Sequence, residues 1–130
     1  MHLFYCLFYI IGLISHAQIN PNNIEIVRDD YGVPHIFSKT DAELAYGLAW
    51  AHAEDDFKTI QQGYLAGNSL LSQVEGKKAL GIDFISQFIG SDRLYEKKYL
   101  SDVSEEYKKI LNAYCEGINR FAELHPEQVL

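Results

Sequence analysis

Four titratable side chains, those of His52, Glu54, Asp55 and Asp56, lie together in the middle of the longest helical pattern of this sequence. In a helix, His52 and Asp56 are one turn apart, a spacing that can place an imidazole and a carboxylate on one metal ion. Two ligands do not close a metal site, and the second histidine of H-E-x-x-H is missing. We therefore favour a polar network without a metal, in which the carboxylates accept hydrogen bonds from backbone amides or from arginines of a packed neighbour.

A second group, Arg28, Asp29 and His35, places a cation, a carboxylate and an imidazole around one predicted turn. A base and a carboxylate can serve catalysis when they activate a nucleophile. The sequence places no serine or cysteine where this group would activate it. Structural ion pairing is therefore the favoured interpretation.

Cysteine and serine nucleophiles are the remaining candidates. Cys115 lies in mid-helix on the flank of an apolar stripe, away from a helix N-terminus that would lower its pKa, and we expect a core thiol. Self-cleavage at Gly90-Ser91, the single Gly-Ser junction, would sever a predicted helical region. The sequence also lacks a glycine-rich phosphate loop and a G-x-S-x-G elbow. We predict no catalytic residue in this segment and assign no substrate-binding residue.

The elements that position these groups begin with a predicted β-hairpin. Residues 24–28 are rich in β-branched side chains and largely alternate between apolar and charged residues, as in a strand. Residues 29–32 are of types that favour a turn, and the sequence of residues 33–37 is again typical of a strand. Pro34 removes one ladder donor, so its strand should have an edge or a bulge there. A lone two-stranded hairpin is marginally stable, and no later stretch is predicted to be a third strand. The missing strands are expected to come from elsewhere.

A long central helix is predicted over residues 40–65, with Thr40 and Glu43 forming a capping box at its start. Small residues along this helix would let neighbouring backbones approach closely. Its predicted apolar stripe recurs at steps of three and four residues and consists of Leu44, Ala45, Leu48, Ala49, Ala53, Phe57, Ile60 and Tyr64.

Further helices are predicted after the central one. A short helical turn at residues 70–75 ends at Gly76, and residues 77–81 are predicted to form a loop. A helix is predicted over residues 82–99. The last helix is expected to be capped by Ser101-Asp102 and to end at His125-Pro126.

The composition limits the classes of protein to which this chain can belong. With 48% hydrophobic and 13% aromatic residues the chain is globular, and its net charge of −7 gives no support to nucleic-acid binding. The lysine pairs, such as the one at 108–109, are expected to be solvated. Residues 1–17 combine an apolar run with small residues before Gln18, as in a secretory signal peptide. We expect export to the periplasm or medium, cleavage before Gln18 and no membrane attachment afterwards.

Two linked motifs carry a resemblance to a known family. The first is Arg28-Asp29 with the run Gly32-Val33-Pro34-His35-Ile36, and the second is Ala51-His52-Ala53-Glu54-Asp55, preceded by Gly47-Leu48-Ala49. This stretch resembles the start of the penicillin acylase family of N-terminal nucleophile hydrolases, and the likeness continues more loosely to about residue 126. The matching motif residues, to which we give a structural role, are Arg28, Asp29, Gly32, Pro34, His35, His52, Glu54 and Asp55.

The resemblance implies a precursor that cuts itself into an α and a β chain and uses a serine at the new β-chain N-terminus to attack an amide carbonyl. It implies an αββα sandwich, N-acyl substrates such as β-lactams or N-acyl homoserine lactones, and calcium in several members. The family's catalytic, acyl-pocket and calcium residues fall beyond the position of Leu130, so none is carried over. Asp56 departs from the family pattern, which usually has arginine at that position.

The sequence therefore predicts an α+β segment, an N-terminal hairpin followed by helices, as part of such a sandwich. Residues 18–130 are expected to be the N-terminal fragment of an acylase α chain, without a cofactor of their own and with the β chain and an N-acyl amide as partners. The alternative is a small exported helical binding module without catalysis, whose hairpin edge would have to be covered by a partner.

Overall fold

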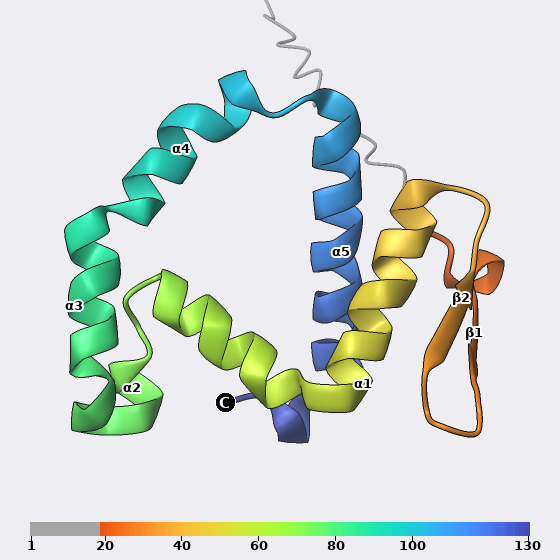
Figure 1. The fold of residues 1–130 in the computed structure, drawn as a ribbon, viewed down its shortest axis with the longest axis horizontal. Coiled ribbons are helices and arrows are strands. Elements are labelled where there is room, and N and C mark those ends of the chain that lie inside the picture. The colour runs from red at the N-terminus through yellow and green to blue at the C-terminus, as the bar shows by residue number, and fades with distance from the viewer. Residues whose placement is uncertain (1–18) are drawn as a thin grey trace, which may run out of the picture.

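The computed structural model describes residues 19–130, and the predicted leader lies outside this part. A short hairpin is followed by helices, as the sequence predicted for an α+β chain (Figure 1). The strands and helices are β1 Glu25–Arg28, β2 Pro34–Phe37, α1 Asp41–Gly67, α2 Ser72–Glu75, α3 Leu80–Ile89, α4 Ser91–Asp102 and α5 Glu105–Leu124. Short 3-10 turns lie at Pro21–Asn23, Gly76–Ala79 and Pro126–Gln128.

The hairpin is antiparallel, and Ile26 pairs with Ile36 and Arg28 with Pro34. Its two strands are the whole sheet within residues 19–130, so both outer edges are open, as expected for the strand that contains Pro34. The sandwich implied by the resemblance would require further strands. The hairpin lies beside the first half of α1, at the end of the molecule away from α3 (Figure 1).

The start of α1 is fixed by local hydrogen bonds, and the predicted capping box is confirmed. The Glu43 N–H donates to the Thr40 hydroxyl at 3.2 Å, and the Thr40 N–H donates to the Glu43 carboxylate at 3.1 Å. Glu43 also accepts from the Asn23 amide at 2.8 Å and from the Lys39 N–H at 3.0 Å. The hydrogen bond from Asn23, together with those from Lys39 and Thr40, keeps the pKa of Glu43 below its ordinary value.

The prediction of an uninterrupted central helix is wrong at Asp56, where the backbone leaves the helical region with φ −158° and ψ 70°. The Asp56 carboxylate accepts hydrogen bonds from the Thr59 N–H at 3.1 Å and from its hydroxyl at 2.6 Å. This is how a residue caps a helix start, so Asp56 begins a second helical half that runs in a new direction (Figure 1).

The first half of α1 packs against α5 through small residues, as the sequence predicted. Ala45, Ala49 and Ala53 are buried, and a Cβ at Gly117 of α5 would lie 2.6 Å from the carbonyl oxygen of Tyr46. A Cβ at Gly47 would lie 2.8 Å from a methyl group of Ile36 in the hairpin. Both glycines therefore set how closely neighbouring elements approach α1.

Three members of the predicted stripe, Leu44, Leu48 and Tyr64, are exposed, so the stripe is narrower than predicted. Further along the interface between α1 and α5, the packing is between aromatic side chains. Phe57 of α1 meets Phe121 of α5 edge to face, with ring centroids 5.1 Å apart.

The later helices differ from the predicted ones at residues 77–81, at Gly90 and at the start of α5. Residues 77–81 form a 3-10 turn and the start of α3 in place of a loop, and the predicted helix over 82–99 is broken at Gly90, whose φ is 68°. The cap of α5 is Ser104, whose hydroxyl accepts from the Tyr107 N–H at 3.2 Å, because Ser101-Asp102 belongs to the last turn of α4. The short helix does end at Gly76, and α5 ends before His125-Pro126, as predicted.

Lys108 contradicts the expectation of solvated lysine pairs because its side chain is buried. Its ammonium group donates to the Leu100 carbonyl at 3.0 Å and pairs with Glu105 at 2.7 Å. These contacts tie the end of α4 to the first turn of α5.

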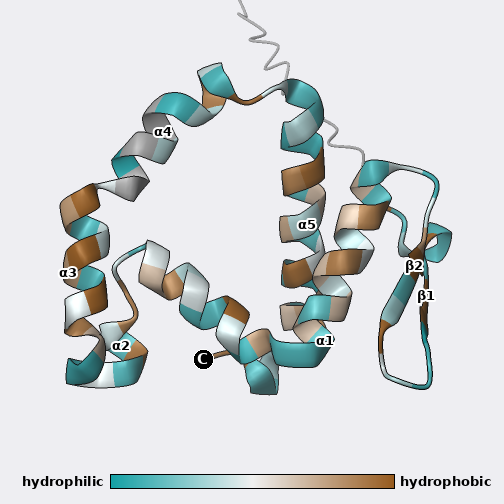
Figure 2. Ribbon diagram, in the orientation of Figure 1, coloured by the Kyte–Doolittle hydropathy of each residue, from teal (hydrophilic) through white to brown (hydrophobic). Residues whose placement is uncertain are grey.

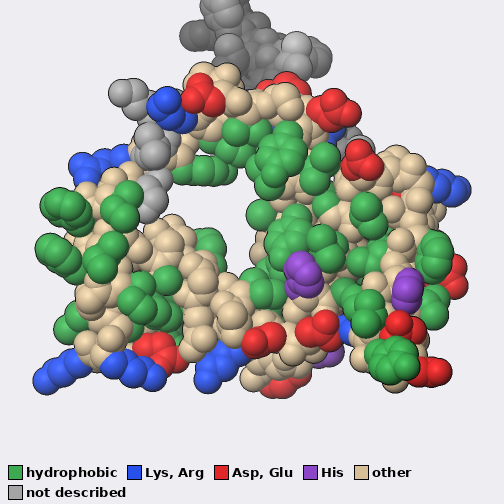
Figure 3. Space-filling model, viewed as in Figure 1, with side chains coloured by type: hydrophobic (Ala, Val, Ile, Leu, Met, Phe, Trp, Pro, Cys, Tyr) green, Lys and Arg blue, Asp and Glu red, His purple; other side chains and the backbone are tan. Residues whose placement is uncertain are grey.

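The surface of α3 is unusually apolar (Figures 2 and 3). Six of its hydrophobic side chains are between 49% and 81% exposed, and they are Leu80, Ile82, Phe84, Ile85, Phe88 and Ile89. A contiguous exposed patch of this kind is typical of a surface that another part of a protein covers. No helix within residues 19–130 is long and apolar enough to cross a membrane.

The close approach at Gly117 gives a direct test of the α1–α5 packing. We expect Gly117→Ala to lower the free energy of unfolding by about 1–3 kcal/mol, because the new methyl group overlaps the Tyr46 carbonyl. Gly63→Ala is the matched control, since nothing lies within 4 Å of its Cβ position. This control should raise stability by up to roughly 1 kcal/mol through helix propensity. Chemical denaturation measures both, and an equal response of the two variants would contradict the packing assignment.

Candidate functional site

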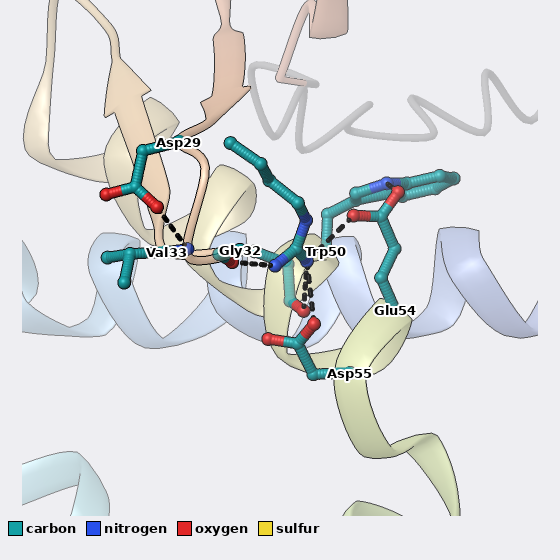
Figure 4. A network of polar contacts seen from close by, with 8 residues as sticks. Asp29, Gly32, Val33, Trp50, Glu54 and Asp55 are labelled. Atoms are coloured by element: carbon teal, nitrogen blue, oxygen red, sulfur yellow. Dashed lines mark hydrogen bonds and ion pairs between the residues drawn. The ribbon is translucent and has the colours of Figure 1, made fainter.

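The two sequence motifs meet at the guanidinium group of Arg28, the last residue of β1. This group forms ion pairs with Asp55 at 2.8 Å and with Glu54 at 3.2 Å, both on α1. It also donates to the Gly32 carbonyl at 2.8 Å and to the Ala51 carbonyl at 3.4 Å. Figure 4 shows Glu54 and Asp55 reaching from α1 toward the hairpin turn at Gly32. We call this group of contacts the Arg28 clamp.

Secondary structure supplies the geometry of the Arg28 clamp. Glu54 and Asp55 are consecutive residues at the end of the first half of α1, directly before its break. The Trp50 indole N–H donates to Glu54 at 2.8 Å from one helical turn earlier and holds that carboxylate in place. A planar guanidinium suits this arrangement because it can donate to two carboxylates and two carbonyls at once.

The guanidinium group of Arg28 is permanently charged. The hydrogen bond from Arg28 to Glu54, followed by that to Asp55, raises the pKa of the guanidinium further above its ordinary value. A group that stays protonated at any physiological pH cannot act as a general base. Arg28 therefore joins the hairpin to α1 and does not act as a general base.

Asp29 closes the hairpin turn. Its carboxylate accepts hydrogen bonds from the backbone N–H groups of Tyr31 and Val33, each at 2.9 Å, and lies 3.4 Å from the His35 imidazole. The hydrogen bond from Val33, with those from Tyr31 and His35, lowers the pKa of Asp29. The structure thus brings together Asp29 and His35 from the predicted group and places Arg28 with α1.

Two members of the predicted network on α1 point to different partners. The imidazole Nδ1 of His52 lies 3.1 Å from the Tyr114 hydroxyl of α5, whereas the Asp56 carboxylate binds Thr59. The helix break at Asp56 removes the regular one-turn spacing that a shared metal ion would need. Within residues 19–130, no group of three or more histidine, cysteine, aspartate or glutamate side chains could hold a metal ion.

Cys115 corrects another expectation, because its thiol is free and exposed. The buried residues of α5 nearest to it are Ala113 and Gly117, each two positions away. Two positions correspond to about 200° around a helix, so Cys115 lies on the side opposite the packed face. The flank position that the sequence suggested is not part of the core.

A groove of about 620 Å³ adjoins the Arg28 clamp, and it is lined by β1, α1 and the end of α5. Its walls are mainly apolar and include the charged residues Arg28, Glu54 and Arg120. The lining residues are Pro21, Ile24, Ile26, Arg28, Tyr46, Gly47, Trp50, Glu54, Arg120 and Leu124. No signal in the sequence predicts this groove, because its walls come from segments up to about a hundred residues apart and meet only in the folded chain.

Comparisons of the sequence with known proteins find a family and several relatives. A sequence model of the penicillin amidase family matches residues 23–129. The chain is 27% identical to penicillin G acylase of Escherichia coli over 95% of its own length and 15% of that protein. It is 23% identical to the acyl-homoserine lactone acylase PvdQ of Pseudomonas syringae pv. syringae, over 83% of its own length and 15% of that protein.

The fold also matches a solved structure. The thermostable penicillin G acylase from Alcaligenes faecalis aligns with 81% of this chain and 55% of its own, with a TM-score of 0.69 and 22% identity. This similarity shows the fold. The chain spans 15% of the length of the two curated relatives named above.

The Arg28 clamp predicts a coupled response to substitution. We expect Arg28→Gln and Asp55→Asn each to lower the melting temperature and to accelerate amide exchange in the hairpin. Their effects should not add, because either substitution breaks the same interaction. Arg28→Lys should rescue only part of the loss, since an ammonium group lacks the planar fork.

A surface ion pair elsewhere provides the control for this experiment. Lys98 and Asp102 on α4 are exposed and 3.4 Å apart, so Lys98→Gln should change the melting temperature little. Strict additivity of the Arg28 and Asp55 substitutions would contradict a shared interaction.

The turn at Asp29 predicts a pH dependence. The pKa of Asp29 is lower in the folded chain than the ordinary value of about 3.9, so its contribution to stability is present above that value. The contribution is lost as the pH falls through the folded pKa. The difference in melting temperature between the unmodified chain and Asp29→Ala should therefore be largest above about pH 4 and shrink below it. Asp30→Ala in the same turn is the matched control, and a gap for Asp29→Ala that is constant from neutral to acid pH would refute the assignment.

Proposed function

This chain belongs to the penicillin amidase family, and on that premise we propose that it forms the N-terminal part of an exported amidohydrolase. The reaction is hydrolysis of a linear amide bond in an N-acyl substrate. The family match over residues 23–129 is the observation that carries the proposal. The relatives named for penicillin G and for acyl-homoserine lactones supply the two substrate classes to test.

In this proposal, residues 18–130 have a structural role and the nucleophile lies outside the chain. The motif residues fit that role, because Arg28 is held by Glu54 and Asp55, and Asp29 is held by the hairpin turn. The nucleophile would be a serine exposed by self-cleavage of a precursor, at the N-terminus of a second chain. One relative from Pseudomonas is named as a proenzyme, which agrees with a processed precursor.

The same proposal covers the remaining properties of the complete enzyme. Residues 1–17 would direct export and be removed, which leaves a periplasmic or secreted protein. The second chain would be the main partner of residues 18–130, and the exposed apolar residues of α3, such as Phe84 and Phe88, would need such a cover. Any calcium ion would be bound outside these residues.

The first experiment is to determine the genomic sequence that follows codon 130. We expect a reading frame that continues through an internal serine at a self-cleavage junction. Expression of that full frame should give two chains, and mass spectrometry should find the serine at the N-terminus of the second. Penicillin G, N-acyl homoserine lactones and chromogenic N-acyl anilides of graded length are the substrates to assay.

Matched controls identify the nucleophile and separate the alternatives. Replacing the exposed serine with alanine should abolish hydrolysis, whereas Cys115→Ser should leave it unchanged because that thiol is exposed on α5. A stop codon directly after codon 130, or a processed protein that hydrolyses none of these amides, would overturn the proposal. The first of these outcomes would favour the binding module without catalysis.

A further inference from the structure

Residues 57–89 form a continuous unit that we call the arm, and it consists of the second half of α1, α2, a 3-10 turn and α3 (Figure 1). Polar contacts tie its parts to one another. The Gln62 side-chain amide on α1 donates to Glu75 of α2 at 2.7 Å. The Asp83 carboxylate of α3 accepts from two backbone N–H groups at the start of α2, at 2.8 and 3.0 Å. The arm is therefore held together by its own contacts.

At each end of the arm, one residue interrupts the helical backbone. Asp56 has φ −158° and ψ 70°, and Gly90 has the left-handed values φ 68° and ψ 41°. Hinges are commonly a few residues at the ends of helices that absorb changes in φ and ψ while the helices themselves stay intact. Glycine adopts left-handed and right-handed conformations about equally readily. Asp56 and Gly90 therefore stand where hinges would be expected.

The apolar contact beside Asp56 permits rotation. Phe57, the first residue of the arm, packs edge to face on Phe121 of α5, and Ile60 packs against the same cluster. The hydrophobic effect has no preferred direction. This contact therefore keeps the arm attached to α5 without fixing its angle.

A directional contact fixes the angle instead. The Gln61 side-chain N–H donates to the Gln128 carbonyl at 3.0 Å, and the side-chain oxygen accepts from the Leu130 N–H at 2.9 Å. We call these two hydrogen bonds the Gln61 latch. Hydrogen bonds require defined distances and angles, so the latch sets one orientation of the arm. Both bonds are exposed, and water can replace them at small net cost.

Movement of the arm would reposition an apolar surface. Figure 3 shows open space between the arm and α5, so the arm can turn toward α5 before side chains collide. The helix α3 belongs to the arm, and its exposed side chains, such as Phe84 and Phe88, would move with it. The angle of the arm therefore decides where this surface lies relative to the hairpin and α5.

We propose that the arm turns as a unit about Asp56 and Gly90, and that the Gln61 latch holds it in the position that the structure shows. When the latch opens, the contact of Phe57 with Phe121 remains as the pivot. The apolar surface of α3 then changes its position relative to the hairpin. This inference goes beyond the proposed function and does not depend on it.

Distances between spin labels on the 130-residue chain test the proposal. Cys115 on α5 is free and exposed, and Tyr64 on the arm is 69% exposed, so Tyr64→Cys supplies the second label site. Cys6→Ser removes the other cysteine of the chain. Pulsed electron paramagnetic resonance measures the distribution of distances between the labels at 64 and 115. A pair within the arm, at Tyr64→Cys and the exposed Gln87→Cys with Cys115→Ser, is the internal reference.

Two neighbouring glutamines give matched variants. Gln61→Ala should roughly double the width of the 64–115 distribution or add a second maximum, because the latch is lost. The reference pair within the arm should keep its narrow distribution. Gln62→Ala also removes a hydrogen bond, but its partner Glu75 lies within the arm, so the 64–115 distribution should stay narrow.

A second substitution tests the hinge at Asp56. Asp56→Ala removes the carboxylate that caps the second half of α1 and favours a continuous helix. In the Gln61→Ala background, we therefore expect Asp56→Ala to shift the mean of the 64–115 distribution, again with no change in the reference pair.

Several outcomes would overturn the inference. An unchanged 64–115 distribution in Gln61→Ala, or one that is already broad while Gln61 is present, would mean that Gln61 is not a latch. Equal broadening of the reference pair would mean that residues 57–89 do not move as a unit. An unchanged mean in the double variant would mean that Asp56 is not the hinge. None of these outcomes depends on hydrolysis, so they are distinct from failure of the proposed amidase activity.

Discussion

The structure depends on the ion pairs between Arg28 and the carboxylates of Glu54 and Asp55. Two strands alone have little stability, and the hairpin is kept in place by what it contacts on α1. Arg28 supplies the polar part of this contact, and the close approach of Ile36 to Gly47 supplies the apolar part. Loss of either would weaken the attachment of the hairpin to the helix.

The helix that receives the hairpin is itself positioned by small residues. Ala49 and Gly117 allow α1 and α5 to approach until the backbone of one nearly touches the other. Directly after Glu54 and Asp55, the break at Asp56 turns the chain toward α2 and α3 (Figure 1). The Asp56 carboxylate binds Thr59 within its own helix. The first half of α1 thus builds the core, and the second half carries the chain to the apolar surface of α3.

The geometry explains why conspicuous motif residues need not be catalytic. Arg28 stays protonated and Asp29 stays ionised because each is surrounded by groups that stabilise its charged form. Perturbed pKa values often mark active sites, but structural ion-pair networks perturb them as well. Here the partners are carboxylates, backbone carbonyls and backbone N–H groups, which hold elements together. Such contacts fit the structural role proposed for these residues.

The sequence by itself determined the features that depend on near neighbours. The capping box at Thr40, the hairpin around Asp29 and the helix end at Gly76 each arise from residues within a few positions, whose backbone preferences act locally. Only the tertiary structure decided which carboxylates pair with Arg28 and that β1, α1 and α5 enclose a groove. These outcomes depend on the relative placement of segments distant in sequence. Packing over the whole chain sets that placement, and no pattern of neighbouring residues in the sequence predicts it.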